Sequence, residues 1–341
     1  MNPVIILEDF HEDILGKAMR GLGIGKNEMA KRIGSQKSHI DGILSGQVNE
    51  SLIRLMAGEL NLDTEKLIRS AHREWSPAPL AIQGLKQLNL PFGDMLVNVY
   101  VIWEQASKNA WVFDAGPMTQ PVLDFIEDEG LNVDAIFLTH THRDHIACLD
   151  ELKEKTGNPS VYVHELEALD GCELITEGFE DSSGTLSIQA LHTHGHALGG
   201  ITYIIEGLES GVAVVGDAIF AGSMGGGMVS YDDALRTNRE KIMTLSEEAI
   251  LCPGHGPMTT VLEEKQNNPF FPEFLLGSKL GPLAIAKISP VLGSLTIIET
   301  LTGVNSSIIL FTSCSTRSCT TRSIDNSTLN PSLASNSTER N

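Results

Sequence analysis

The residue types best suited to chemistry lie in one short run at residues 139–145. Its sequence, Thr-His-Thr-His-Arg-Asp-His, holds three histidines and an aspartate. Imidazole nitrogens and carboxylate oxygens both bind divalent cations. In extended or loop backbone, His140 and His142 point to the same side, so both imidazoles can reach one ion. Asp144 and His145 follow the expected turn and point elsewhere, which suits a second ion beside the first. We therefore predict a metal site here.

The elements on either side of this run explain how it is positioned. Residues 133–138 are apolar except for Asp134 and include β-branched members, which predicts a buried strand. Ile146-Ala147-Cys148-Leu149 predicts the opening of a helix. The run therefore falls at the carboxyl end of a strand, where open α/β sheets place their sites.

Three further motifs place ligand-type residues beside glycine after an expected strand. They are His192-Thr193-His194-Gly195-His196 after 186–191, Gly216-Asp217 after 212–215, and Gly254-His255-Gly256 after 250–251. Glycine lets the backbone approach a metal site closely. We also expect strands over 95–103, 110–113, 161–163 and 201–205, and a helix over 121–128. This order favours two sheets sandwiched between helices over one doubly wound sheet.

Taken in order, these motifs resemble the metallo-β-lactamase superfamily over about residues 85–272. The matching pattern is His-x-His-x-Asp-His, then Thr-x-Gly-His, Gly-Asp and Gly-His-Gly. The resemblance implies an α+β fold, the αβ/βα sandwich, with the site at one edge of the sheets. It implies that one metal is held by His140, His142 and His196. It implies that the second is held by Asp144, His145 and His255, with Asp217 bridging both.

Other residues are expected to support these ligands. Asp114, in the turn Phe-Asp-Ala-Gly, matches the early aspartate of the family, which holds the site from behind the ligands. We interpret His192 and His194 as supporting or structural residues, because relatives more often have proline in place of His194.

Two divalent ions that share one carboxylate can hold a hydroxide between them at neutral pH, because each ion lowers the pKa of the water. One ion also polarises a carbonyl and stabilises the oxyanion that attack produces. Ligands without a thiolate suit zinc, and iron or manganese fit almost as well. We expect Asp144 to orient the hydroxide and to return a proton to the leaving group.

The class of substrate is restricted by the motifs that this chain shares with subgroups of the superfamily and by those that it lacks. Thiolate-bearing β-lactamases have cysteine in place of Asp217, so antibiotic hydrolysis is disfavoured. Residues 216–220 resemble the Gly-Asp-x-x-Phe stretch of glyoxalase II, which favours a hydroxyacylglutathione hydrolase-like thioesterase, with a lactonase as an alternative. That family then uses a basic residue and a tyrosine to hold glutathione, whereas residues 225–228 here are Gly-Gly-Gly-Met. Iron-bearing members act on thiols or oxygen, so an oxidative role is a further alternative.

The charge distribution restricts the substrate further. The net charge is −20, and residues 76–273 alone hold 9 Lys and Arg against 30 Asp and Glu. Such an acidic body repels polyanions, so a nucleic-acid backbone is disfavoured as a substrate. A small-molecule thioester or ester is the expected partner.

Residues 10–75 predict a small all-α domain of consecutive short helices. Helices over 26–33 and 35–44, joined at Gly34 with Ser35 as the cap, resemble the helix-turn-helix of Cro/C1 repressors. In that family the second helix enters the major groove of DNA. The residues that would face DNA are Gln36, Lys37, Ser38 and His39.

The role of this helical domain stays open between two classes. Residues 17–54 hold seven Lys and Arg against three acids, which agrees in sign with DNA binding. The protein would then be a transcriptional regulator whose metal domain senses a metabolite. The alternative is a docking or dimerisation domain without DNA contact, which makes a homodimer a candidate.

The remaining segments carry little chemistry. Ser76-Pro77-Ala78-Pro79 is a natural linker, and residues 274–341 are rich in Ser, Thr and Asn, which predicts a disordered tail. Five cysteines without disulfide-framework spacing favour a reducing cytoplasm. The sequence shows neither the start of a signal peptide nor an apolar run of about eighteen residues, so we expect no membrane span.

Overall fold

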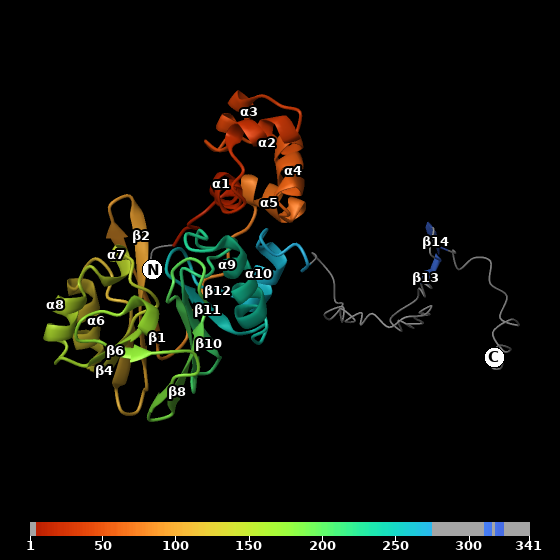
Figure 1. The fold of residues 1–341 in the computed structure, drawn as a ribbon. Helices are drawn as coiled ribbons and strands as arrows, with labels where there is room; N and C mark the ends of the chain where they lie inside the picture. Colours follow the sequence, from red (N-terminus) through yellow and green to blue (C-terminus); the bar gives the residue numbers. More distant parts are fainter. Residues whose placement is uncertain (1–4, 275–309, 316–317, 324–341) are drawn as a thin grey trace, which may run out of the picture. The chain divides into compact units, whose positions relative to one another are not determined.

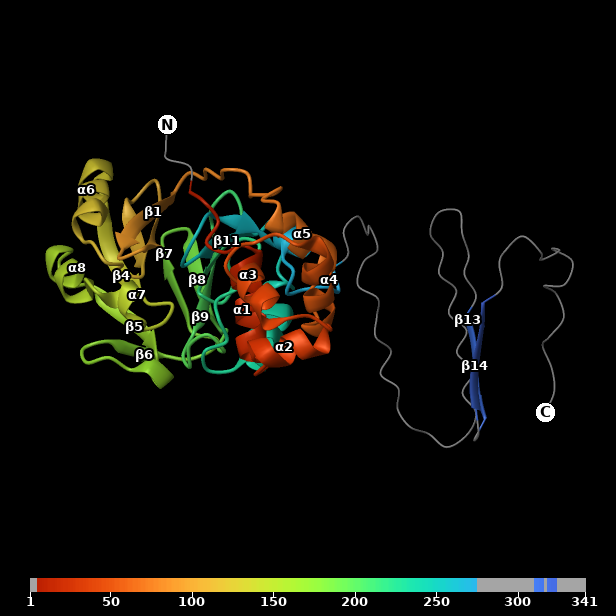
Figure 2. The same cartoon turned by 90° about the horizontal axis from the view of Figure 1, so that it is seen from above.

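The computed structural model describes residues 5–274, 310–315 and 318–323 (Figure 1, Figure 2). The chain divides into two compact units, Met1–Lys279 and Leu280–Asn341. In the second unit the described residues form two antiparallel strands, β13 (Leu310–Ser315) and β14 (Ser318–Ser323). The rest of the predicted disordered tail lies outside the described residues.

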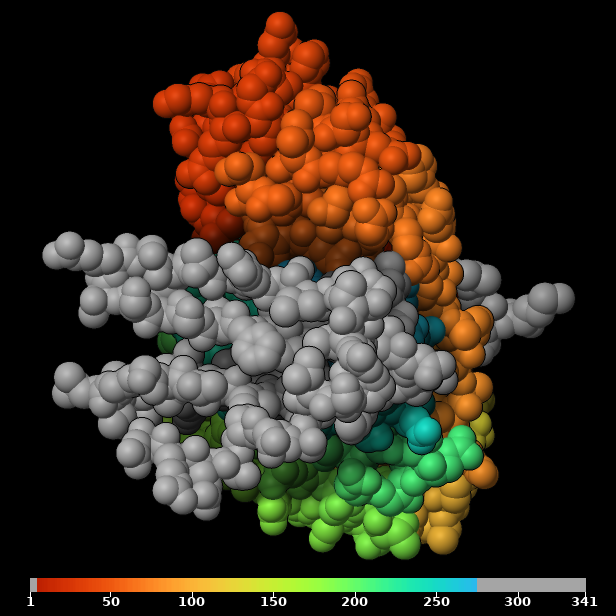
Figure 3. All heavy atoms as spheres, turned by 90° about the vertical axis from the view of Figure 1, so that its right-hand side faces the viewer, coloured from red at the N-terminus to blue at the C-terminus, as the bar shows by residue number. Residues whose placement is uncertain are grey.

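The first unit opens with five short helices, as the sequence predicts. They are α1 (His11–Gly21), α2 (Lys26–Arg32), α3 (Lys37–Ile43), α4 (Glu50–Glu59) and α5 (Thr64–Ala71). Their apolar residues do not form a separate core. Ile14 and Leu67 belong to one buried cluster with Val215 and Leu251 of the following fold. Figure 3 shows the red and orange atoms of this helical module gathered at one end of the unit.

Two six-stranded sheets follow the helical module. The first contains, in spatial order, β1 (Leu85–Phe92), β2 (Met95–Trp103), β3 (Asn109–Phe113), β4 (Asn132–Phe137), β5 (Ser160–His164) and β6 (Glu173–Ile175). The second contains β12 (Thr259–Thr260), β11 (Ile250–Pro253), β10 (Val212–Gly216), β9 (Ile201–Glu206), β8 (Leu186–His192) and β7 (Glu180–Ser183).

Helices connect and cover the strands of these sheets. They are α6 (Gln120–Glu129), α7 (Arg143–Ile146), α8 (Leu149–Lys155), the 3₁₀ turn η1 (Glu165–Glu167), α9 (Tyr231–Thr237), the π-helical turn η2 (Asn238–Ile242) and α10 (Val261–Asn267).

Strand β10 shows how the sequence builds the layers. Val212 and Val214 face the core between the sheets, whereas Ala213 and Val215 face the cluster that includes the helices. Successive side chains of a strand point to opposite faces, so a strand that is apolar at every position needs cover on both sides. The result is the mixed α+β arrangement of two sheets between helices that the sequence predicts.

Some predicted boundaries were wrong. The helix expected to open at Ile146 instead begins as the single turn α7 at Arg143, so Asp144 and His145 lie on a helical turn. Ser35 does not cap α3, whose N-cap is Gln36, and the Ser35 hydroxyl bonds His39 Nδ1 instead (3.0 Å). Strands β1, β6, β7 and β12 were not predicted from the sequence. Most are short or edge strands, and β7 is the polar run Glu-Asp-Ser-Ser without an apolar face.

No helix among the described residues is long and apolar enough to cross a membrane.

Lys66 on α5 gives the first testable prediction. Its buried ammonium donates to the carbonyls of Lys265 (2.8 Å) and Phe271 (2.9 Å), and burial lowers its pKa from 10.5 to about 8. Between these two pH values the unfolded chain binds more protons, so this group should raise the free energy of unfolding as pH increases from 8 to 10.5. The rise is on the order of 3 kcal/mol, and it should be lost as pH falls through 8.

Urea denaturation of wild type and Lys66→Met at pH 7.5 and 10.5 measures this difference. The variant should be less stable throughout, because two buried carbonyls lose their donor. It should also lack the rise with pH, whereas Lys37→Met, which removes an exposed ammonium, should keep it. Parallel pH curves for wild type and Lys66→Met would contradict the prediction.

Candidate metal centre

The predicted ligands come from the carboxyl ends of four strands. His196, Asp217 and His255 follow β8, β10 and β11, respectively. These strands run in the same direction, because β10 pairs parallel with β11 and both β8 and β10 pair antiparallel with β9. The ligands on the first sheet follow β4. Loops at one edge of the sandwich therefore bring together residues that are more than one hundred positions apart.

Seven side chains gather there in two groups that could each hold a metal ion. In each group, one ligand atom per residue lies within 4.8 Å of the others. The first group is His140, His142, His196 and Asp217, and the second is Asp144, His145 and His255.

Asp217 connects the two groups. Its Oδ2 lies 3.3 Å from Nε2 of His196 in the first group and 3.5 Å from Nε2 of His255 in the second. Its Oδ1 lies 3.4 Å from Nε2 of His145. In the second group, Asp144 Oδ2 lies 3.3 Å from His255 Nε2. One buried carboxylate therefore faces ligand atoms of both groups.

Hydrogen bonds on the outer side fix the orientation of three imidazoles. His196 Nδ1 donates to the carbonyl of Gly226 (2.9 Å), and His255 Nδ1 donates to the carbonyl of Leu96 (2.8 Å). His145 Nδ1 donates to Asp114 Oδ2 (2.8 Å). In a neutral imidazole the other nitrogen then carries a lone pair. Each Nε2 lone pair points into the cluster, which is the arrangement that metal-binding histidines have.

Asp114 supports two of the ligands from behind. Besides His145, its carboxylate accepts from the backbone N–H (2.8 Å) and the hydroxyl (2.9 Å) of Thr139. The Thr139 oxygen in turn lies 3.0 Å from Nδ1 of His140. Asp114 has the left-handed φ of 59°, which is strained for a residue other than glycine. The chain therefore adopts an unfavourable backbone conformation where this carboxylate is held.

The donor set fits divalent ions. His140 Nε2, His145 Nε2 and Asp217 Oδ1 are buried and lack a hydrogen-bond partner among the described residues. Nδ1 of His142 and Nε2 of His196 face each other at 2.9 Å. Buried polar atoms without partners are rare in proteins because desolvation is unfavourable. Cations between these inward-facing atoms would satisfy them.

The electrostatics of the cluster also favour added positive charge. Burial lowers the pKa of His145, but the charges of Asp114 and Asp217 outweigh it and raise this pKa to about 10. Burial likewise opposes the charged form of His255, yet Asp217 and Asp144 raise its pKa to about 11. Burial raises the pKa of Asp217, and the neighbouring imidazoles His255, His145 and His196 reverse this and hold it well below its usual value. The buried carboxylates thus need cationic partners.

Known proteins are similar to this domain in sequence and fold. The family model of the metallo-β-lactamase superfamily matches residues 92–255. The probable metallo-hydrolase YqgX of Bacillus subtilis (strain 168) is 32% identical over 218 residues, which are 56% of this chain and 100% of that protein. The chain belongs to the metallo-β-lactamase superfamily.

Other relatives of this superfamily domain point to hydrolases. Hydroxyacylglutathione hydrolase GloC of Haemophilus influenzae is 28% identical over 199 residues, covering 51% of this chain and 92% of that protein. The crystal structure of BLEG-1 B3 metallo-beta-lactamase is similar with a TM-score of 0.50 and 30% identity, covering 55% of this chain and 99% of that one. These matches span a little over half of the chain. The relatives, the fold and the clustered His and Asp side chains together indicate a hydrolase that binds divalent metal.

His192 and His194 lie beside the superfamily site rather than within either ligand group. With His164 they form a stack, with ring centroids 4.2 Å apart for His164 and His192 and 4.4 Å apart for His192 and His194. His192 Nε2 donates to the carbonyl of Leu198 (2.9 Å). Among the described residues, neither side chain has a hydrogen bond to a predicted ligand. His192 thus holds the 192–200 loop, whereas His194 Nε2 lies 3.7 Å from Asp233 Oδ1.

Sequence reasoning missed Glu167, which joins two ligand loops. One carboxylate oxygen accepts from the backbone N–H (2.7 Å) and the hydroxyl (2.8 Å) of Thr141, between His140 and His142. The other accepts from the backbone N–H of Gly199 (2.9 Å), three residues after His196. No sequence motif marks Glu167, because most of its partners are backbone groups that only the fold brings to it.

The predicted DNA-facing residues are located at the start of α3. Gln36 is the N-cap, and Lys37, Ser38 and His39 are exposed in the first turn. The ammonium of Lys37 pairs with Asp41, which also accepts from Lys26. Part of the basic charge of this surface is therefore neutralised within the module.

Proposed function

We propose that this domain is a binuclear metal-dependent hydrolase that cleaves a thioester or a related ester. The observation that carries the proposal is the double ligand group around Asp217, in which three imidazoles are held by outer hydrogen bonds with their Nε2 atoms directed inward. We assign His140, His142 and His196 to one ion, and Asp144, His145 and His255 to the other. Asp217 is assigned to both.

Each group in the site has a distinct task. When bound, divalent ions lower the pKa of a coordinated water and polarise a substrate carbonyl, and zinc, iron or manganese can do so. Asp217 holds negative charge between the two ligand groups. Asp114, the Gly226 carbonyl and the Leu96 carbonyl keep the imidazoles in one orientation. We assign to Asp144 the task of taking up a proton and passing it to the leaving group.

Three exposed apolar residues lie on chain segments that carry or hold the ligands, and we propose that they contact an apolar acyl group. Leu96, Leu198 and Met228 are 37%, 48% and 73% exposed. Each lies on a segment tied to a ligand: Leu96 accepts from His255, Leu198 follows His196 by two residues, and Met228 follows the Gly226 carbonyl by two residues. Exposed apolar side chains near a site are suited to contact with an apolar ligand.

Three basic side chains that follow the glycine-rich loop, and that could hold an anionic carrier such as glutathione, are already paired. Arg236 pairs with Asp233 and Glu240, Arg239 with Glu273, and Lys241 with Glu177. We therefore propose an ester or thioester with an apolar acyl group. The substrate panel below tests whether glutathione is the carrier.

A substrate panel tests the proposal. Protein purified without chelators is assayed against acyl thioesters of increasing chain length, S-lactoylglutathione, a lactone, a phosphodiester and a β-lactam. The account predicts hydrolysis of thioesters or esters, improving with acyl length and abolished by chelation. The β-lactam is included because BLEG-1 is named a B3 metallo-beta-lactamase. Activity on the phosphodiester or β-lactam alone would overturn the assignment.

Replacing Asp144 by Asn tests its role with the proton. Burial works to raise the pKa of Asp144, but the hydrogen bond with His255 and the charge of His145 outweigh it, so this pKa lies below its usual value. The group is then ionised at neutral pH and can accept a proton. Asparagine keeps an oxygen but cannot take up the proton, so kcat should fall roughly 10²-fold or more. Asp150→Asn, an exposed change on α8, should have no effect. Full turnover with full metal content in Asp144→Asn would refute the role.

A DNA-binding regulator remains the second candidate function. The observation that favours it is the helix pair α2 and α3 with Gln36, Lys37, Ser38 and His39 exposed at the start of α3. In this case residues 10–75 are a helix-turn-helix module attached to a metallo-hydrolase domain over 85–272. The double variant Gln36→Ala/Lys37→Ala should abolish a sequence-specific gel shift and leave hydrolysis unchanged. If wild type does not shift DNA at low salt, this candidate fails.

A further inference from the structure

We propose that the helical module positions part of the metal centre. In this proposal Asp9 and Lys17 are positioning residues that fix the loop of residues 220–226 and, through it, the imidazole of His196. The inference rests on the metal-binding half of the proposed function and not on any choice of substrate.

The contacts begin with a largely buried ion pair between the N-terminal segment and α1. The Lys17 ammonium on α1 pairs with the Asp9 carboxylate and donates to the carbonyl of Met224 (2.9 Å). Asp9 Oδ2 also accepts from the hydroxyl of Ser223 (2.6 Å). Asp9, Ser223 and Met224 are buried. Two neighbouring loop residues are therefore held by charged groups from the helical module.

The same loop is held from the opposite side by α10 and the residue after it. The buried Glu264 carboxylate accepts from the backbone N–H of Gly222 (3.0 and 3.1 Å). Asn268 Nδ2 donates to the carbonyl of Ser223 (2.7 Å). Residues 222–224 thus lie between two sets of hydrogen bonds, and the loss of either set allows the loop to move.

The loop determines the position of one ligand in each group. The Gly226 carbonyl accepts from His196 Nδ1, which leaves the lone pair on Nε2 for a metal. A Cβ on Gly225 would lie 1.9 Å from the Asp217 carbonyl and 2.8 Å from His196 Nδ1, so the loop backbone fits directly against the site. The ring of Phe220, in the same loop, contacts His255 with centroids 5.4 Å apart.

The ammonium of Lys17 also lies over the face of Phe220, 4.8 Å from its centroid. A single cation thereby contacts the loop at two points, one beside each ligand group. Buried ion pairs contribute little net stability because desolvation offsets the attraction, so this pair is better explained by the one loop arrangement that it selects.

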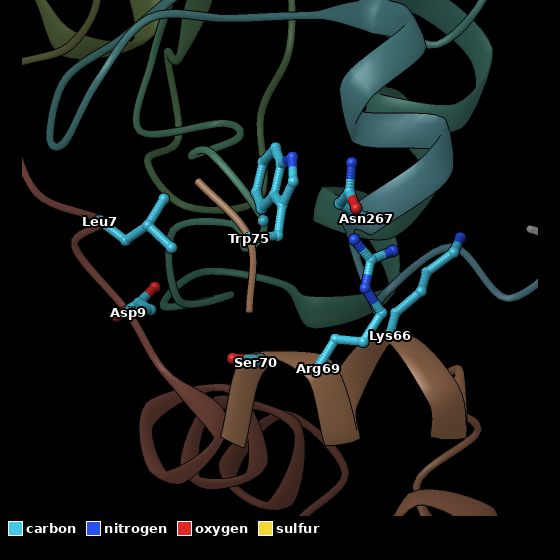
Figure 4. A pocket seen from close by; sticks show the side chains of 8 residues that line it. Leu7, Asp9, Lys66, Arg69, Ser70, Trp75 and Asn267 are labelled. Carbon is cyan, nitrogen blue, oxygen red and sulfur yellow. The ribbon is translucent and has the colours of Figure 1, made fainter. Parts of the chain in front are cut away.

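Further contacts hold the helical module against the rest of this unit. Figure 4 shows the small cavity at the interface, with Leu7 and Asp9 on the N-terminal segment, Lys66, Arg69 and Ser70 on α5, and Asn267 of α10 across from them. Lys66 donates to the carbonyl of Lys265 on α10 and to that of Phe271 after it, and the apolar core is continuous across the interface. These contacts hold the module in place, so that Asp9 and Lys17 can fix the loop.

The test measures metal affinity rather than hydrolysis. Zn²⁺ affinity of Lys17→Met is determined by competition with a chromophoric chelator, and the coordination is followed by Co²⁺ absorption. Removing an outer partner of a metal ligand typically weakens binding 10- to 100-fold, so we expect at least a roughly 10-fold loss and altered Co²⁺ bands. Lys17→Arg should restore most of the affinity. Lys26→Met, in the same module but exposed and paired with Asp41, should match wild type.

Ser223→Ala removes only one hydrogen bond of the network, so it is the second test variant if Lys17→Met does not fold. It should weaken Zn²⁺ binding several-fold and shift the Co²⁺ bands in the same direction. Wild-type affinity and spectrum in either folded variant would overturn the inference. Failure of wild type to bind metal would instead overturn the proposed function, and a metal-loaded wild type that is inactive on thioesters would reject only the substrate.

Discussion

Replacing Asp217 by Asn should abolish both the binuclear metal centre and hydrolysis. The carboxylate is the one group among the described residues whose oxygens lie within 3.5 Å of imidazoles from both ligand groups. Asparagine removes its negative charge and places N–H donors against imidazole lone pairs. A metal centre supplies several kcal/mol of transition-state stabilisation, so kcat/KM should fall by roughly 10³-fold or more.

Metal content and steady-state kinetics of the same preparation measure this effect. Asp150→Asn, which removes one exposed negative charge from α8, is the matched control and should behave as wild type. An Asp217→Asn protein that keeps two ions per chain with wild-type affinity would show that this carboxylate does not join the two sites.

Replacing Gly254 by Ala should disrupt the centre almost as severely, although no ligand is removed. A Cβ at Gly254 would lie 2.2 Å from Asp217 Oδ1 and 2.7 Å from His145 Cε1. Both side chains are buried, and the His145 imidazole is held by its hydrogen bond to Asp114, so the two atoms cannot both move away. The substitution should therefore displace the shared carboxylate and lower metal affinity at least about 10-fold.

The control for Gly254→Ala is Gly211→Ala, directly before the opposite end of β10. There the nearest atom to a new Cβ is Glu206 Oε1 at 3.6 Å, which is an ordinary contact. Chelator competition should distinguish the two variants clearly. Equal affinities would mean that the close packing of Gly254 against Asp217 has no role in metal binding.

The sequence was informative about the ligand loops because their residue types and spacing are direct chemical requirements. Histidines at i and i+2 and an aspartate closing a strand are visible without a structure. The structure brings His140, His142, His196 and Asp217 into one group and Asp144, His145 and His255 into the other. That each group holds one metal ion, with Asp217 shared between them, stays a prediction. The apolar strands around them were also predicted to within one or two residues.

The supporting contacts could not be predicted, because they join residues that no local pattern connects. Asp9 and Ser223 are separated by 214 positions, and Lys17 and Met224 by 207. Glu167 acts on backbone groups, which carry no sequence signature. For the same reason, residues 10–75 were interpreted as a separate module, while the structure gives them a core continuous with the outer face of the second sheet.

The central claim is that one chain holds two divalent ions around Asp217. Metal analysis of protein purified without chelators, combined with calorimetric titration of the chelated protein, tests it most directly. The account predicts two ions per chain of wild type. A wild-type chain that binds one ion or none, and that still hydrolyses its substrate at full rate, would contradict the account.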